Sequence, residues 1–289
     1  VTSSVGGFGA YNVQFGNLGT SLWVDSLYYA DNKHTFTSNG LAAWANWRVA
    51  RSKFIGNKFL INGTNTPTQP TVCFADSSAG NLFLRDTILA YGSGRQRIAW
   101  ASNSASSGSL QNTCINSTID SCYILSRNGP AIDFSDAAMR GWNIKRTVAV
   151  SSGAQAMRVG NSKVNGIGFG AKNYIDHNTF ASDHVATGAN ALTETGVVGF
   201  DGMKTATDSV RFTNNIVYSF RPGGVTADTV SAVGFYLVDA DTLNGHASKF
   251  RQHFYSNWNA YGVYPMTATA GDKSISYVRA NGLAYAKPG

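Results

Sequence analysis

Charged residues are scarce in this chain. Asp, Glu, Lys and Arg together make up 13% of its 289 residues, about half the usual share, and Glu194 is the sole glutamate. Exposed helix positions are normally rich in Glu and Lys, so a mainly helical protein is disfavoured. Gly, Ser, Thr, Asn and Ala take the place of the charged residues, and they suit turns and stacked strands. The composition therefore predicts an all-β fold.

Cysteine is almost absent as well. Cys73, Cys114 and Cys122 form an odd set without CxxC spacing, which indicates neither a disulfide framework nor a zinc site. We interpret them as buried side chains that act as small apolar fillers. The sequence has no apolar run of 18 residues, so no membrane span is expected. It opens at Val1 without a signal peptide, and we interpret it as a mature product or a part of a longer chain.

The few charges are unbalanced. The formal net charge is +7 and the pI is about 9.3, which points to an anionic partner. Nucleic acid is not expected, because the basic residues are scattered and no zinc-finger spacing or RNA-binding signature is present. An acidic polysaccharide and a virus shell both fit a dispersed positive surface, and both stay open.

A five-residue pattern recurs along the chain: an apolar residue, two polar residues, a Ser, Thr or Asn, and a second apolar residue. Its first positions are 49, 84, 115, 144, 175, 212 and 250, so the spacing runs from 29 to 38 residues. We expect the positions from 49 to 212 to form one inward-facing column. The Ser/Thr/Asn position is expected to form hydrogen bonds between successive repeats; its members include Thr87, Thr118, Thr147 and Asn215.

A second motif alternates with the first and consists of two apolar residues separated by one residue, usually followed by Asp or Asn. Residues 72–74, 132–134 and 157–159 are examples. Each repeat of about 30 residues therefore contains at least two short strands. Because side chains alternate between the faces of a strand, the apolar residues of each motif face one way. One repeat cannot bury this face alone, but repeats stacked about 4.8 Å apart form a continuous core.

This two-motif period predicts a single-domain parallel β-helix. A β-sandwich is disfavoured, because its strands would recur every 8 to 12 residues or so without such a period. Residues 1–40 are expected to cover the first coil, residues 41–262 to form the coils, and residues 263–289 to extend beyond them. Covers are needed because the open end of a solenoid exposes unpaired strand edges.

Two segments, Asn173–Phe180 and Val210–Val217, resemble coils of the right-handed parallel β-helix superfamily, which includes pectate-lyase-like enzymes and bacteriophage tailspikes. The resemblance covers about residues 41–260. The segment Gly19–Asp25 also resembles the strand that opens β-helix regions in phage virion proteins. The resemblance implies a right-handed all-β solenoid outside a cell or on a virion. It implies a polysaccharide or other virion proteins as partners, with a homotrimer as one candidate assembly.

The outward side of the triplet motif provides one set of candidate site residues. Asp133 and Arg158 hold its middle position in consecutive coils, so they should be neighbours. Glycoside hydrolysis needs two carboxyl groups, which Asp133 and Asp136 could supply. The competing interpretations are a surface ion pair between Asp133 and Arg158 and an ordinary turn residue at Asp136.

The outward side of the five-residue motif provides a second set, Lys145, Arg146, Asp176 and His177. Arg146 and His177 should lie about one coil apart. A polysaccharide lyase needs a base and a cation that faces the substrate carboxylate, and these residues together with Arg158 fit those roles. No cofactor is expected, although a bound divalent cation is compatible with lyase chemistry. A solvated histidine beside Asp176 is the ordinary alternative for His177.

Aromatic residues near the C-terminal end suit sugar binding. Trp258 and Tyr261 could stack on sugar faces or close the end of the core. The catalytic signatures of polygalacturonases and mannuronan epimerases are absent from the sequence, so enzymatic activity stays open. Two functions follow. One is recognition of a surface polysaccharide, with or without its cleavage, and the other is a structural role as a virion decoration, tail or fibre protein.

Overall fold

The structure is a computed structural model that describes residues 2–3, 11–15, 23–36, 42–62, 72–75, 78–92, 98–102, 115–127, 129–134, 139–159, 172–183, 197–201, 209–219, 235–238 and 254–263. These residues form strands, turns and bends, and none of them is helical. Accordingly, the described ranges hold no helix with the length and apolar character needed to cross a membrane. The prediction of an all-β fold is confirmed.

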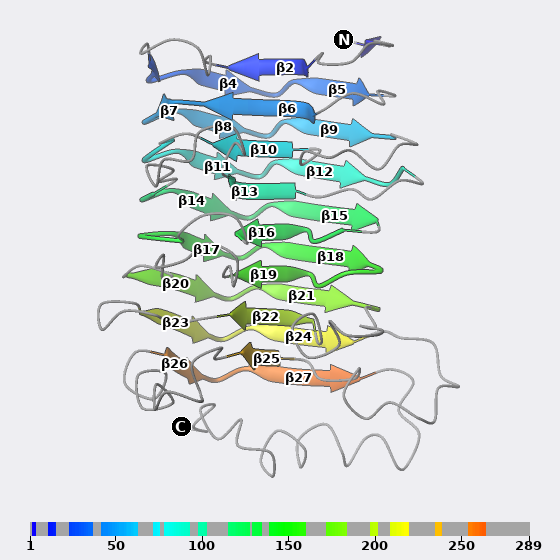
Figure 1. Ribbon diagram of the computed structural model, residues 1–289, viewed down its shortest axis with the longest axis vertical. Helices are drawn as coiled ribbons and strands as arrows, with labels where there is room; N and C mark the ends of the chain where they lie inside the picture. Colours follow the sequence, from blue (N-terminus) through cyan, green and yellow to red (C-terminus); the bar gives the residue numbers. More distant parts are fainter. Residues whose placement is uncertain are drawn as a thin grey trace.

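Three long parallel sheets make up the fold (Figure 1). Sheet A consists of β1 (Thr2–Ser3), β5 (Lys33–Phe36), β9 (Lys58–Ile61), β12 (Thr87–Ala90), β15 (Tyr123–Arg127), β18 (Val148–Ser152), β21 (Thr179–Ser182), β24 (Ile216–Ser219) and β27 (Ala260–Val263). Sheet B consists of β2 (Tyr11–Phe15), β6 (Ala42–Trp47), β10 (Val72–Ala75), β13 (Ile98–Ser102), β16 (Ile132–Phe134), β19 (Met157–Val159), β22 (Val198–Asp201) and β25 (Phe235–Val238). Sheet D consists of β4 (Tyr28–Ala30), β8 (Lys53–Ile55), β11 (Leu82–Leu84), β14 (Thr118–Asp120), β17 (Asn143–Lys145), β20 (Asn173–Asp176), β23 (Val210–Thr213) and β26 (Phe254–Asn257). A short sheet C pairs β3 (Val24–Asp25) with β7 (Val49–Ala50).

The chain visits the sheets in a constant order. From β10 onward it runs through sheet B, then sheet D, then sheet A, and each strand pairs in parallel with its counterpart in the next coil. Figure 1 shows the coils as successive layers, with the strands of sheet D on the left and those of sheet A on the right. A coil therefore contains three strands, because the five-residue motif turns a corner and enters two sheets.

A column of inward-facing side chains runs down sheet D. The register aligns Phe54, Phe83, Ile119, Ile144, Ile175 and Phe212, each at most 1% exposed. Predicted positions 144, 175 and 212 are thus confirmed, and position 84 lies one residue from Phe83. Positions 49 and 115 are wrong, because Val49 pairs with Val24 in sheet C and Ile115 forms isolated bridges outside the three large sheets. The same pattern matched there because the turn before sheet D is also flanked by buried apolar residues.

The corner between sheets D and A repeats a six-residue unit. Buried apolar residues begin and end the six units between Phe54 and Val217, as in Ile144 to Ala149 and Ile175 to Phe180. The third residue of each unit adopts a left-handed backbone conformation, with φ between 51° and 66°, and these residues are Asp31, Gly56, Arg85, Ser121, Arg146, His177, Asn214 and Trp258. This conformation turns the chain sharply from one sheet into the next, although most non-glycine residues avoid it.

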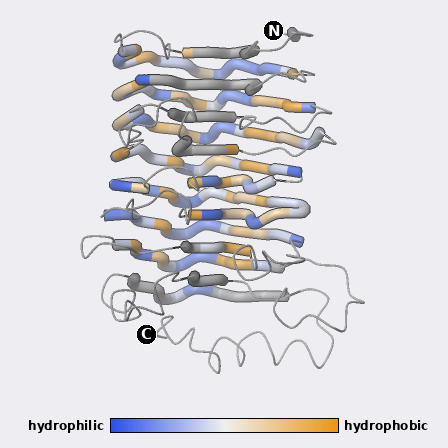
Figure 2. The backbone as a smooth tube through the Cα atoms, in the orientation of Figure 1, coloured by the Kyte–Doolittle hydropathy of each residue, from blue (hydrophilic) through white to orange (hydrophobic). Residues whose placement is uncertain are grey.

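The fourth residue of each unit points inward and joins a polar ladder. The ladder positions are Asn32, Asn57, Asp86, Cys122, Thr147, Asn178, Asn215 and Asn259. Each asparagine from Asn57 onward accepts a backbone N–H bond from the previous coil, as Asn178 Oδ1 does from Thr147 N at 2.9 Å. Its amide donates to a carbonyl of that coil, as Asn178 Nδ2 does to Ile144 O at 2.9 Å. Figure 2 shows the hydrophilic colour returning at this corner in successive coils.

The ladder corrects one expectation and confirms another. Thr147 and Asn215 bridge successive coils as predicted, but Thr87 and Thr118 do not lie in the ladder, since each begins a strand. Cys122 takes a ladder position, is 3% exposed, and donates its thiol to Phe83 O at 3.5 Å. Burial raises the pKa of this thiol to about 12. Its predicted role as a buried filler is confirmed, whereas Cys114 and the side chain of Cys73 lie outside the described residues.

A buried histidine marks the N-terminal end of the core. His34 is 6% exposed, stacks on Phe59 with ring centroids 5.2 Å apart, and hydrogen-bonds the Tyr29 hydroxyl. Burial lowers the pKa of His34 below its ordinary value of 6.5, because the folded state disfavours the charged ring.

We expect His34 to reduce the free energy of unfolding as pH falls below about 6.5. His34→Phe keeps the stack and should show a smaller loss of thermal midpoint between pH 7.5 and pH 5 than the wild type. Equal losses would contradict this assignment.

Candidate functional site

The outer side of the corner between sheets D and A carries a band of charged and polar side chains, here called the corner strip. It comprises Arg85, Asp120, Lys145, Arg146, Asp176, His177 and Asn214. The left-handed turn directs Arg146 and His177 away from the core, and their side chains are 59% and 63% exposed. Arg146 and His177 occupy the same turn position in consecutive coils, as the sequence predicted.

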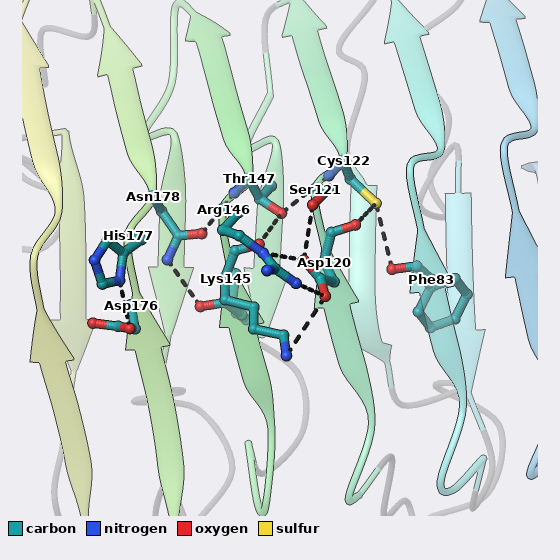
Figure 3. A network of polar contacts seen from close by, with 11 residues as sticks. Phe83, Asp120, Ser121, Cys122, Lys145, Arg146, Thr147, Asp176, His177 and Asn178 are labelled. Atoms are coloured by element: carbon teal, nitrogen blue, oxygen red, sulfur yellow. Dashed lines mark hydrogen bonds and ion pairs between the residues drawn. The ribbon is translucent and has the colours of Figure 1, made fainter.

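Asp120 anchors one half of the corner strip (Figure 3). Its Oδ1 accepts hydrogen bonds from Arg146 Nε at 2.8 Å and Ser121 Oγ at 2.9 Å, and Lys145 Nζ lies 3.5 Å from its Oδ2. Arg146 also donates through Nη2 to Oδ2, which makes the contact bidentate. Burial of Asp120, which is only 6% exposed, would by itself raise its pKa, but the bonds from Arg146 and Ser121 and the charge of Lys145 outweigh this effect and lower the pKa. Asp120 is therefore ionised at neutral pH.

Asp176 organises the next coil in the same way. Its Oδ1 accepts hydrogen bonds from Thr213 Oγ1 at 2.6 Å and Asn214 Nδ2 at 2.9 Å, and its Oδ2 lies 2.6 Å from His177 Nδ1. Partial burial opposes ionisation of Asp176, yet the bonds from Thr213, Asn214 and His177 prevail and lower the pKa of its carboxyl group. Figure 3 shows His177 and Arg146 side by side on neighbouring strands, each with its own aspartate.

Two exposed aromatic side chains flank the corner strip. Tyr174 is 46% exposed on the outer face of β20, where the register places it between Asn143 and Arg211. Trp258 is 70% exposed and holds the corner position two coils beyond His177. Tyr261 lies in β27 in register with Val217, and its side chain lies outside the described residues. The corner strip thus combines charges of both signs with flat apolar surfaces.

Asp133 and Arg158 lie elsewhere, in strands β16 and β19 of sheet B. They are register neighbours, as the sequence predicted. However, Asp133 is only 1% exposed, which differs from the expected solvent-facing carboxylate. Arg158 is aligned with Gly199, where the Gln155 amide packs so closely that an added Cβ would lie 2.3 Å from Nε2. The sequence grouped Arg158 with Arg146 and His177 in the lyase roles, but Arg158 lies in β19 of sheet B, whereas Arg146 and His177 lie at the corner between sheets D and A.

The corner strip is better suited to binding than to acid catalysis. A general acid for glycoside hydrolysis needs a raised pKa, whereas Asp120 and Asp176 both have lowered pKa values. Within the ranges that the structure describes, no three His, Cys, Asp or Glu residues are grouped as a metal site would require. Asp136 lies outside the described residues. Neither Asp120 nor Asp176 therefore has the raised pKa of a general acid, and both carboxylates act as fixed negative charges in the strip.

Comparison with known proteins places this chain in no family: no family model, no curated protein and no solved structure matches it. The site therefore rests on the geometry of the chain itself. Sequence reasoning identified Lys145, Arg146, Asp176 and His177 but missed Asp120. The signal that finds Asp120 is the six-residue corner unit, in which its position is equivalent to that of Lys145 and Asp176.

Proposed function

We propose that this protein is a right-handed parallel β-helix that binds a surface polysaccharide along the corner strip, outside a cell or on a virion. Three parallel sheets visited in constant order support the β-helix assignment. The net charge of +7 supports an anionic glycan. Recognition of the glycan, with cleavage as a further step, also agrees with the resemblance of its coils to tailspikes and pectate-lyase-like enzymes.

The observation that carries the proposal is the regular spacing of the strip. Lys145 and Asp176 are register neighbours, and Arg146 and His177 follow them at the corner. Coils lie about 4.8 Å apart, which is close to the length of one sugar unit, so an extended chain can meet several coils at once. Tyr174 and Trp258 offer exposed ring faces on which sugar rings can stack.

Binding without cleavage is the simpler form of the proposal. Asp120 and Asp176 are held ionised, and each is occupied by hydrogen bonds to its own neighbours. Such carboxylates orient sugar hydroxyls or the cationic side chains beside them. The alternative function is a structural role in a virion, which predicts that no glycan binds the corner strip.

The test is a glycan array followed by calorimetry with the best acidic glycan. Lys145→Ala and Tyr174→Ala should each weaken binding by roughly tenfold, the loss of one charge-assisted hydrogen bond or one stacking contact. The affinity should fall as salt rises, because the Debye length is only about 8 Å at physiological ionic strength. Lys145→Ala should reduce that salt dependence, whereas Tyr174→Ala should not.

Arg51→Ala is the matched control. Like Lys145, Arg51 is a cation paired with an aspartate, here Asp25, but it lies at a different turn and its side chain is 72% exposed. Its removal should leave glycan affinity unchanged. An assay for new reducing ends and unsaturated products, with Asp133→Asn as a comparison, separates binding from cleavage. Failure to bind any acidic glycan, together with tight association with capsid or tail proteins, would establish the structural alternative.

A further inference from the structure

The outer face of sheet A differs from the outer face of sheet D. One outward row of sheet A contains Leu60, Leu89, Leu125, Val150, Ala181 and Tyr218, all aligned by the register and all half-buried. The row beside it contains Thr87, Tyr123, Val148, Thr179 and Ile216. Neither row carries a charge from β12 to β24, whereas the same coils of sheet D present Asp120, Lys145, Asp176 and Arg211. We call these two rows the apolar face.

The apolar face is comparable in area to the largest apolar patch of a typical monomer. From β12 to β24 it measures roughly 300 Å² in plan, at about 4.8 Å between strands and about 3.3 Å per residue. Ile216 and Tyr123 are 50% and 41% exposed on it, and Tyr91 at its edge is 39% exposed. The largest apolar patch of a soluble monomer is often functional, so the apolar face is a candidate interaction surface.

A third outward row at the edge of sheet A adds charges in a specific order. Arg127 is in register with Ser152, and Ser152 Oγ donates to Asp183 Oδ2 at 2.9 Å in the following coil. Gly153 N donates to Asp183 Oδ1 at 2.6 Å, which fixes this carboxylate in place. Opposite charges thus lie two coils apart in one row, on either side of the coil that contains Val150.

The geometry points to a second copy of this chain as the occupant of the apolar face. A two-fold axis along the strand direction through β18 makes the two solenoids antiparallel. Arg127 then faces Asp183 of the partner subunit, and this pair forms twice. Val150 faces its own copy, Leu125 faces the small Ala181 of the partner subunit, and Leu89 faces the partner's Tyr218. A parallel arrangement would instead set each coil against its own copy, so Arg127 and Asp183 of the partner subunit would lie two coils apart.

The plan area sets the expected strength. Two faces of this size bury less than the roughly 1,200 Å² of stable complexes. The dissociation constant of the dimer should therefore be on the order of micromolar. The corner strip lies outside the apolar face, so this inference is independent of the proposed glycan binding.

Sedimentation velocity on the full chain from about 1 to 100 μM tests the inference. The wild type should pass from monomer to dimer over this range. Val150→Arg places two cations at the axis and should abolish the dimer. Arg127→Asp and Asp183→Arg should each weaken it at least tenfold, because each variant opposes like charges twice, and thermal melts verify that each is folded.

Mixing the two charge variants gives the decisive measurement. A heterodimer of Arg127→Asp with Asp183→Arg has opposite charges at both contacts, so the mixture should regain wild-type association. Lys53→Asp, an exposed change on sheet D, should leave association unchanged. A wild type that stays monomeric at about 100 μM, a trimer mass, or a mixture that stays dissociated would overturn the two-fold interface.

Discussion

Asp86→Asn is expected to stabilise the protein at neutral and alkaline pH, by up to roughly 4 kcal/mol above pH 7. Asp86 holds a ladder position that is otherwise filled mainly by asparagine, and its Oδ1 accepts bonds from Asn57 N at 2.7 Å and Asn57 Nδ2 at 3.0 Å. Its Oδ2 is the one buried side-chain polar atom without a hydrogen-bond partner among the described residues. Burial raises the pKa of Asp86 from 3.8 to about 7, despite the bonds from Asn57.

The ladder explains why an amide fits better than a carboxylate. At equivalent positions Asn57 Nδ2 donates to Tyr29 O and Asn178 Nδ2 donates to Ile144 O, each at 2.9 Å. The equivalent acceptor for residue 86 is the carbonyl of Phe54, which a carboxylate oxygen repels. A protonated Asp86 can donate to that carbonyl, and an asparagine can do so at any pH.

The pH dependence follows from the same geometry. Because the folded pKa of Asp86 lies above the unfolded one, its contribution to stability is fully present below pH 3.8 and is lost as pH rises through about 7. The gain from Asp86→Asn should therefore appear above pH 7 and vanish near pH 4, as measured by urea denaturation across this range. Asn178→Asp in the same ladder is the matched opposite and should destabilise most above pH 7. A gain for Asp86→Asn that does not change with pH would refute the assignment.

Ile144→Asp is expected to lower the free energy of unfolding by at least about 5 kcal/mol. Ile144 is fully buried in the middle of the sheet D column, in register with Ile119 and Ile175. The substitution removes apolar packing and places an unpaired carboxylate in the core. The loss equals a large fraction of the total stability of a typical domain, so the thermal midpoint should fall by more than about 10 °C.

Asn143→Asp adds the same charge one residue earlier. Asn143 faces outward and is partly exposed, so this control should change the free energy of unfolding by about 0.5 kcal/mol or less. If Ile144→Asp had the same thermal midpoint as Asn143→Asp, Ile144 would not face the core and the register of sheet D would be wrong.

Much of the repeat was predictable from the sequence, since strand alternation makes the apolar pattern visible without coordinates. Ile144, Ile175 and Phe212 take their expected column because each begins a five-residue motif that continues through the corner. Val49 and Ile115 were misplaced because the turn that enters sheet D and the turn that leaves it have similar local sequences. In each, a left-handed residue precedes an inward polar one: Ser52 and Ser117 at the turn before sheet D.

The candidate site was predictable only in part. Lys145, Arg146, Asp176 and His177 were recognised as outward neighbours, because the period alone determines which positions stack. The bidentate contact between Arg146 and Asp120 was not, because it depends on the side chain of Arg146 reaching back one coil from a left-handed turn. The burial of Asp133 was not predictable either, because the alternation of side chains along one strand does not indicate what covers the strand's outer face.

The sequence by itself determined the all-β class, the coil length and the residues that stack upon one another, since these depend on local periodicity and on the alternation of side chains along a strand. The tertiary structure alone decided how the motifs divide among three sheets, which residues carry the left-handed corners, and which charges share a surface. Those features depend on the direction in which the chain leaves each turn. That direction is set by backbone conformation at single residues and by packing between coils, and the pattern of apolar residues specifies neither.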